Sequence, residues 1–207
     1  MVLQRIRNRL ASYGPILIDD PHVARAAVAM VLHGTRQGVE ILLIERAKRS
    51  GDPWSGHMAF PGGRCHPDDP NVVYTAIRET REEVGLDLQT HAEVVGRLDE
   101  VRSMAWQRPL DLVISPIIWV LEETVPLRLD AREVESSVWV PLVFFRDAAA
   151  RAAHRRTQDG AQNEVPAYRY ETYTIWGLTL RMLDRFLMVV GEVDGSEEQE
   201  AKGKTRQ

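Results

Sequence analysis

Three glutamates on one predicted helical turn are the most informative chemical feature of this chain. Glu79, Glu82 and Glu83 stand at positions i, i+3 and i+4, directly after Arg78. Like charges at these spacings oppose helix formation by about 0.2–0.5 kcal/mol per pair. A hard divalent cation such as Mg²⁺, which takes carboxylate, water and phosphate oxygens, would turn this repulsion into attraction. The alternative is a solvated helix face on which Arg78 pairs with Glu82.

The residues upstream favour the metal site. The segment 59–63, AFPGG, predicts a short apolar strand that runs into a tight turn, and its two glycines allow a backbone carbonyl or amide to approach a metal or phosphate closely. Asp69 and Pro70 then predict a helix start, with Asp69 as the N-cap and Pro70 at the first helical position. Gly85 predicts the end of this helix.

This arrangement resembles the Nudix box, written G-x5-E-x7-R-E-U-x-E-E-x-G-U, where U is a bulky apolar residue. The second half matches from Arg78 to Leu86, with Thr80 in the first U position. The first half fits after a one-residue insertion, as Gly63-x5-Asp69-x8-Arg78, with Asp in place of Glu. The resemblance implies an α/β fold, a Nudix-type α/β/α sandwich around a mixed β-sheet.

The longer spacing with Asp is similar to the coenzyme A pyrophosphatase branch, whose upstream signature is LLTxR(S/A)-x3-R-x3-G-x3-FPGG. The segment 42–47, LLIERA, matches the first part of this signature, and Gly56-x3-Phe60 followed by PGG matches its last part. Two positions differ, because Ile44 replaces Thr and Asp52 replaces Arg. Since Asp52 would repel a phosphate, we expect weak affinity for the phosphates of the coenzyme, with the 3′-dephospho form cleaved at least as well. Further segments similar to this branch follow in order at 96–101, 114–117, 133–142 and 175–179.

The resemblance implies Mg²⁺-dependent hydrolysis of the pyrophosphate bond in a nucleoside diphosphate derivative, with Mn²⁺ able to substitute. Coenzyme A is the first expected substrate, giving 4′-phosphopantetheine and 3′,5′-ADP. ADP-ribose, a dinucleotide or a nucleoside triphosphate remain open as alternatives. A non-catalytic nucleotide-binding domain also remains open, although the intact glutamates of the box count against it.

The resemblance also assigns roles to individual residues. Glu79, Glu82, Glu83 and the Gly63 carbonyl would bind the metals, and Arg78 would orient the carboxylates. The general base would be one of these glutamates or one from a later loop, where Glu133 and Glu135 are the candidates. Cations expected near the substrate phosphates are, first, Arg46 and Arg64, and then Lys48, Arg49 and the basic 155–156 pair, which we expect in a loop.

Composition restricts the partners. The chain has 207 residues, 44% of them hydrophobic, and its 26 Lys and Arg against 30 Asp and Glu give a net charge of −4. This mildly acidic balance argues against general nucleic-acid binding, which leaves a small-molecule nucleoside diphosphate as the expected partner. A single cysteine, Cys65, cannot form an internal disulfide, and apart from its neighbour His66 no further base or orienting residue accompanies it as a nucleophile. With neither a signal-peptide core nor a membrane-spanning run, we expect a cytoplasmic protein without a membrane partner.

The chain is expected to form one main domain over 25–190. Residues 1–24 would provide an amphipathic helix at 2–12 and a lead-in, acting as a packing element or as the contact of a homodimer. Residues 191–207 form a polar tail for which we expect disorder. The expected strands span 25–33, 39–45, 93–99, 111–122 and 137–140, and helices are expected near Pro141 and over 175–190.

Overall fold

The computed structural model describes residues 2–49, 54–105, 108–158 and 161–191. The α-helices are α1 (Val2–Ala11), α2 (Val72–Val84), α3 (Leu88–His91) and α4 (Gly177–Val190). The strands are β1 (Ala24–Thr35), β2 (Gly38–Arg46), β3 (Met58–Ala59), β4 (Gly62–Arg64), β5 (Ala92–Arg97), β6 (Val101–Ala105), β7 (Arg108–Leu121), β8 (Val134–Pro141), β9 (Arg151–Gln158), β10 (Ala161–Tyr170) and β11 (Tyr173–Trp176). Two short 3-10 helices, Leu142–Arg146 and Ala148–Ala150, connect β8 to β9.

The main sheet is mixed and is organised around β1. Its central path runs β3-β2-β1-β7-β5, while β4 pairs with β1, β6 with β7 and β8 with β2. β1 and β7 are parallel over a long stretch, from Ala24 opposite Leu112 to His33 opposite Leu121. The neighbouring β2 is antiparallel to β1, as a hairpin requires. The predicted hairpin of the first two strands is confirmed.

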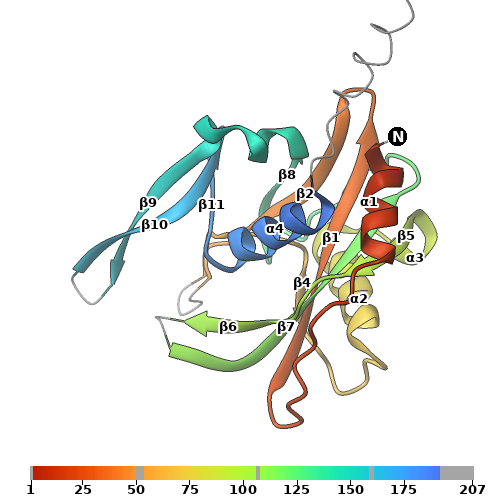
Figure 1. Ribbon diagram of the computed structural model, residues 1–207. Coiled ribbons are helices and arrows are strands. Elements are labelled where there is room, and N and C mark those ends of the chain that lie inside the picture. Colours follow the sequence, from red (N-terminus) through yellow and green to blue (C-terminus); the bar gives the residue numbers. More distant parts are fainter. Residues whose placement is uncertain (1, 50–53, 106–107, 159–160, 192–207) are drawn as a thin grey trace, which may run out of the picture.

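Alternate residues of β1 enter two separate cores, one on each face of the sheet. Met30 and Leu32 join the core that contains Phe186 of α4, whereas Ala29 and Val31 join the core that contains Ala76 of α2. Figure 1 shows α1 and α4 in front of the sheet and α2 behind it. Because both faces of β1 are covered, its sequence is continuously apolar rather than alternating. The predicted α/β/α sandwich around a mixed sheet is confirmed.

A second, three-stranded sheet of order β11-β10-β9 was not expected from the sequence. Figure 1 shows the β9 and β10 ribbons extending away from the main sheet. The basic 155–156 pair therefore lies in β9 and not in a loop, because pairing with β10 overrides the weak strand propensity of this polar segment. The expected helix over 175–190 is wrong in its first two residues, which belong to β11, and the element after Pro141 is a 3-10 helix.

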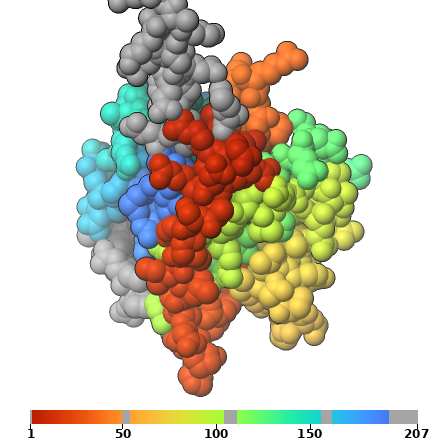
Figure 2. Space-filling view, turned by 45° about the vertical axis from the view of Figure 1, so that its right-hand side comes forward, coloured from red at the N-terminus to blue at the C-terminus, as the bar shows by residue number. Residues whose placement is uncertain are grey.

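The N-terminal segment is part of the same core. Ile6 and Leu10 of α1 are buried in the core on the α4 side. Figure 2 shows this segment lying lengthwise over one face of the molecule. The division of the chain at residues 24 and 190 stays a prediction, and the expected disorder of the tail concerns residues that, from 192 on, lie outside those described. No helix within the described ranges combines the length and the apolar character needed to cross a bilayer.

A buried carboxylate ties the lead-in to the sheet. The side chain of Glu100 is 3% exposed and accepts hydrogen bonds from the Ser115 hydroxyl at 2.6 Å, the Ile18 amide at 2.8 Å and Arg25 at 3.0 Å. Burial alone would raise the pKa of Glu100, but these hydrogen bonds outweigh it and lower the pKa. Glu100 therefore contributes stability above its unfolded pKa, and this contribution is lost as the pH falls through the lowered folded value.

We expect Arg25→Gln to reduce the free energy of unfolding by about 1.5–3 kcal/mol, because it leaves a buried carboxylate without its charged donor. Urea unfolding at pH 7 measures this change. Arg155→Gln is the matched control, since Arg155 pairs with Glu164 where both side chains are exposed, and it should cost less than about 1 kcal/mol. Equal decreases in the free energy of unfolding would show that the Arg25–Glu100 pair stabilises the fold no more than an exposed ion pair does.

Candidate active site

The start of α2 differs from the sequence prediction. Asn71 is the N-cap, and its side chain accepts a hydrogen bond from the Tyr74 amide at 3.0 Å. Asp69 lies two residues before the cap, so its carboxylate is free to accept from the Thr75 hydroxyl at 2.8 Å and from Arg78. The prediction that Asp69 caps this helix is therefore wrong, and Asp69 instead anchors Arg78. The predicted end at Gly85 is confirmed, since Gly85 has φ +68° in the left-handed region.

Arg78 is the centre of a charged network. It donates to both oxygens of Asp69 at 3.0 and 2.9 Å, to Glu79 at 2.7 Å, to Glu82 at 3.1 Å and to the Arg64 carbonyl at 3.1 Å. The hydrogen bonds from Arg78 hold the pKa of Asp69 well below its usual range, and Asp69 in turn raises the pKa of Arg78. This guanidinium therefore stays charged and fixes the direction of the Glu79 carboxylate.

Glu83 is the most deeply buried carboxylate of the box. Its side chain is 2% exposed, accepts a hydrogen bond from the Gly62 amide at 2.8 Å and lies 4.0 Å from the guanidinium of Arg46. Burial raises the pKa of Glu83 to about 8, and the charges of Glu79 and Glu133 add to this effect. Burial likewise raises the pKa of Glu79, although the hydrogen bond from Arg78 opposes the shift. For both groups the cost of burying the ionised form therefore exceeds what the neighbouring positive charge offsets.

Two positions of β4 must be glycine because neighbouring atoms approach the strand closely. Gly62 has φ +150°, and a Cβ atom there would lie 2.2 Å from the Ala27 carbonyl oxygen of β1. A Cβ atom on Gly63 would lie 2.4 Å from Oε2 of Glu79. Only glycine lets this strand pack against β1 and the carboxylates of α2 at the same time.

These elements surround a cleft of about 490 Å³ between the main sheet, α2 and α4. Of the residues predicted from the sequence, the cleft is lined by Arg46, Gly63, Arg64, Glu79, Glu83 and Glu133. Arg78 and Glu82 do not line it, and the Glu82 side chain is 58% exposed beside Arg78. Glu133 is 45% exposed and lies 3.7 Å from Arg49. The cleft thus has an acidic end, formed by Glu79, Glu83 and Glu133, next to a largely apolar remainder.

Other residues named from the sequence lie elsewhere. Glu135 is exposed on β8 and does not line the cleft. Ile44 is fully buried in the core beneath α2, so a side chain at this position does not reach the cleft, contrary to the role that the signature comparison suggested. Arg155 pairs with Glu164 on the projecting hairpin. The expectation for Asp52 falls outside the described residues.

One wall of the cleft was not predicted from the sequence. The ring of Trp176 lies between those of His57 and His154, with centroid distances of 4.6 and 4.7 Å. Thr179 donates to the Met58 carbonyl at 2.8 Å, which fixes the first turn of α4 against β3. Arg181 follows on the same helix and also lines the cleft. The IWGLT segment at 175–179 was noted from the sequence, but its position facing the box helix depends on tertiary packing.

The donor set fits a hard divalent cation. Within the described parts of the chain, no three acidic, histidine or cysteine side chains converge as a preformed metal site, and Arg78 neutralises Glu79 and Glu82. Carboxylate oxygens of Glu79 and Glu83 nevertheless adjoin the backbone of Gly62 and Gly63. Oxygen donors of this kind suit Mg²⁺ or Mn²⁺ rather than a metal that prefers sulfur.

A family model described as the NUDIX domain matches residues 23–159. The mitochondrial coenzyme A diphosphatase NUDT8 of Mus musculus is 31% identical over 179 residues, which cover 85% of this chain and 81% of the mouse protein. An uncharacterized protein of Schizosaccharomyces pombe, C14C4.10c, is 49% identical over 105 residues, which cover 49% of this chain and only 32% of the yeast protein.

Among solved structures, a C. elegans Ap4A hydrolase in a binary complex is similar over 58% of this chain and 82% of that chain, with 21% identity and a TM-score of 0.45. The family match covers more than half of the present sequence, including the Arg78 network, the glycines of β4 and the buried Glu83. The chain therefore belongs to the Nudix family of pyrophosphohydrolases.

Proposed function

We propose that this chain is a Mg²⁺-dependent pyrophosphatase that hydrolyses coenzyme A, or a related coenzyme A species, to 4′-phosphopantetheine and 3′,5′-ADP. The observation that carries the proposal is the acidic end of the cleft, where the buried Glu83 and the Arg78-oriented Glu79 face the glycines of β4. Nudix hydrolases generally use divalent metal ions. The name of the mouse relative, a coenzyme A diphosphatase, supports the substrate.

The residues of the site have different roles in the proposed reaction. Glu79, Glu83 and the Gly63 carbonyl would hold the cation, with Glu82 beside them. When bound, this ion supplies Lewis-acid stabilisation of charge on the diphosphate and lowers the pKa of a water molecule. Arg78 keeps Glu79 in place through its bonds to Asp69. Arg46 is suited to contact the diphosphate because it lines the cleft 4.0 Å from Glu83.

Glu133 is the proposed general base. It lines the cleft and is partly exposed, and its charge affects the pKa values of both Glu79 and Glu83. It would accept the proton of the water that attacks phosphorus, while the anhydride P–O bond breaks and the second phosphate leaves. Glu135 is less suited to this role because it does not line the cleft.

A substrate panel tests the reaction class and the substrate together. Coenzyme A, 3′-dephospho-coenzyme A, ADP-ribose, a dinucleoside polyphosphate and a nucleoside triphosphate are incubated with Mg²⁺ or Mn²⁺, and products are identified by mass. Coenzyme A and its 3′-dephospho form should be hydrolysed in preference to the other members. A clear preference for another member would replace the substrate while keeping the chemistry. A cytoplasmic location and a homodimer remain predictions from the sequence.

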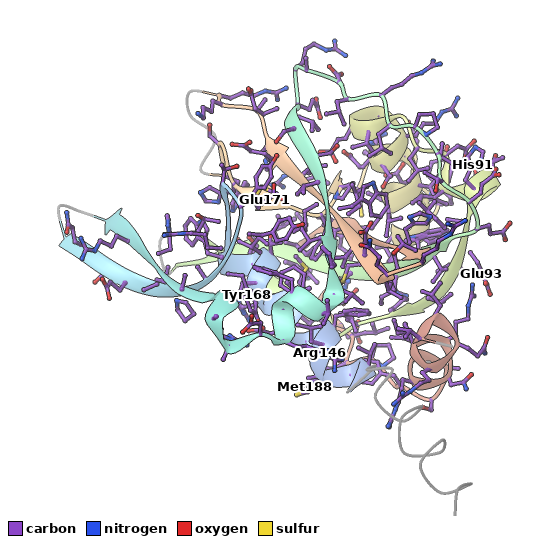
Figure 3. The ribbon with its side chains drawn as sticks, turned by 90° about the horizontal axis from the view of Figure 1, so that it is seen from above. His91, Glu93, Arg146, Tyr168, Glu171 and Met188 are labelled. Atoms are coloured by element: carbon purple, nitrogen blue, oxygen red, sulfur yellow. The ribbon has the colours of Figure 1, made fainter. Side chains whose placement is uncertain are left out.

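Removing a carboxylate from the cleft should remove most activity. Glu83→Gln and Glu79→Gln are each expected to lower kcat by about a hundredfold or more, because each deletes one charge that holds the cation. Glu93→Gln is the control, because Glu93 pairs with Arg7 on an exposed surface and lies toward the opposite side of the molecule from the β9–β10 hairpin (Figure 3). Near-normal turnover in the cleft variants would contradict the metal assignment.

The Arg78→Ala variant tests whether Arg78 orients Glu79 or instead stabilises the fold. The variant releases Glu79 from its only short guanidinium contact in the described chain, so we expect kcat to fall about ten- to a hundredfold. Steady-state kinetics and urea unfolding are measured on the same preparations, with Arg155→Gln as an exposed control. If stability collapses in parallel with activity, Arg78 has a structural role and the orienting role is wrong.

The raised pKa of Glu83 gives a pH signature. Its folded pKa of about 8 exceeds the ordinary value of 4.5, so the stability that it contributes is complete below pH 4.5 and is lost as the pH rises through 8. In EDTA, the wild type should lose more stability than Glu83→Gln between pH 5.5 and 8.5, as measured by thermal melts. Added Mg²⁺ should raise Tm most at the higher pH. Parallel pH profiles for the two proteins would show that Glu83 ionises normally.

A further inference from the structure

Arg181 is a cation of the cleft that no group among the described residues neutralises. It lies in α4 and lines the cleft from the side opposite the box helix. Within the described residues, its guanidinium has no hydrogen bond or ion pair. An unpaired arginine in a concave site is available for an anionic group of a ligand.

The acids and bases nearest to Arg181 on its own helix are already engaged. Asp184, three residues further on, accepts from the Tyr168 hydroxyl at 2.8 Å and from Arg151 at 3.2 Å. Figure 3 shows Tyr168 on β10 beside α4. Arg185 pairs with Asp99 at 2.5 Å. The helix therefore presents Arg181 to the cleft while its other charges serve the fold.

The remaining cations of the cleft belong to its acidic end. Arg46 lies 4.0 Å from Glu83. Arg64 follows Gly63 directly, and its carbonyl accepts from Arg78, so it is placed beside Glu79 and the proposed diphosphate position. Arg181 comes from the other wall, where Leu178 and Met182 are its apolar neighbours in the cleft lining. Arg181 is therefore placed to meet a phosphate on the α4 side of the cleft, whereas the diphosphate is proposed to lie beside the carboxylates of α2.

The wall that carries Arg181 is also firmly positioned. The hydroxyl of Thr179 is bonded to the backbone of β3, and Trp176 is packed between two histidine rings. Because α4 begins against these contacts, Arg181 projects from a fixed helix and not from a loop. Such placement limits the entropy that is lost when a ligand binds.

We propose that Arg181 is a specificity-determining residue that binds a phosphate outside the diphosphate, namely the 3′-phosphate of the adenosine half of coenzyme A. The inference rests on the proposed function. Arg181 would take the role of the arginine that the coenzyme A signature has where this chain has Asp52. The proposal therefore predicts a preference for the 3′-phosphorylated substrate, whereas the signature alone predicted no such preference.

The test compares matched pairs of ligands. Values of kcat/KM are measured for coenzyme A and 3′-dephospho-coenzyme A, and Kd values for 3′,5′-ADP and 5′-AMP are measured by calorimetry without metal. Arg181→Gln should reduce the selectivity for the 3′-phosphorylated member about tenfold in both measurements, the effect of losing one charged contact. Arg181→Lys should restore part of it.

Two further variants make the outcome specific. Arg64→Gln should weaken both members of each pair alike, and Arg155→Gln, outside the cleft, should leave the selectivity at its wild-type value. Unchanged selectivity in Arg181→Gln, or equal losses for both members, overturns the assignment. Failure of the wild type to hydrolyse either coenzyme would instead refute the proposed function, whereas normal hydrolysis without a role for Arg181 refutes only this inference.

Discussion

The bond between Arg78 and Asp69 is the interaction on which the site depends. Arg78 is one residue from Glu79 and four from Glu82, and it donates hydrogen bonds to both. Without a further contact, its guanidinium could move with either carboxylate. Asp69 is 3% exposed and binds two of its guanidinium nitrogens from outside the helix. This contact holds the Arg78 guanidinium beside Glu79, and it joins the loop before α2 to the helix face that carries the glutamates.

The cleft also contains a carboxyl group, that of Glu83, at a position where burial disfavours its ionised form. Glu83 is buried beneath the cleft with one backbone donor, Gly62, and with Arg46 only at 4.0 Å. Folding without a cation therefore favours the protonated carboxyl group, at a cost that a hydrophobic residue would avoid. Such a conflict between stability and local structure is common where a group is kept for binding or chemistry.

The sequence predicted the parts of the structure that depend on local pattern. The apolar run of β1 and the glutamate spacing of α2 led to the sandwich and to the residues at the acidic end of the cleft. The role of Asp69 was mistaken because Asp69 and Asn71, two residues apart, are both good caps, and only the backbone path decides between them. Arg181 and the β9–β11 sheet were missed because long-range packing, not local propensity, creates them.

The most direct test of this account is calorimetric titration of the protein with Mn²⁺ at pH 7 in buffers of different ionisation enthalpy. If the buried Glu83 carboxyl is a ligand with a pKa near 8, binding should release about one proton per cation, because the ligand must ionise. Glu83→Gln should bind Mn²⁺ more weakly and release no proton. Tight binding without proton release in the wild type, or unchanged binding in Glu83→Gln, would contradict the account.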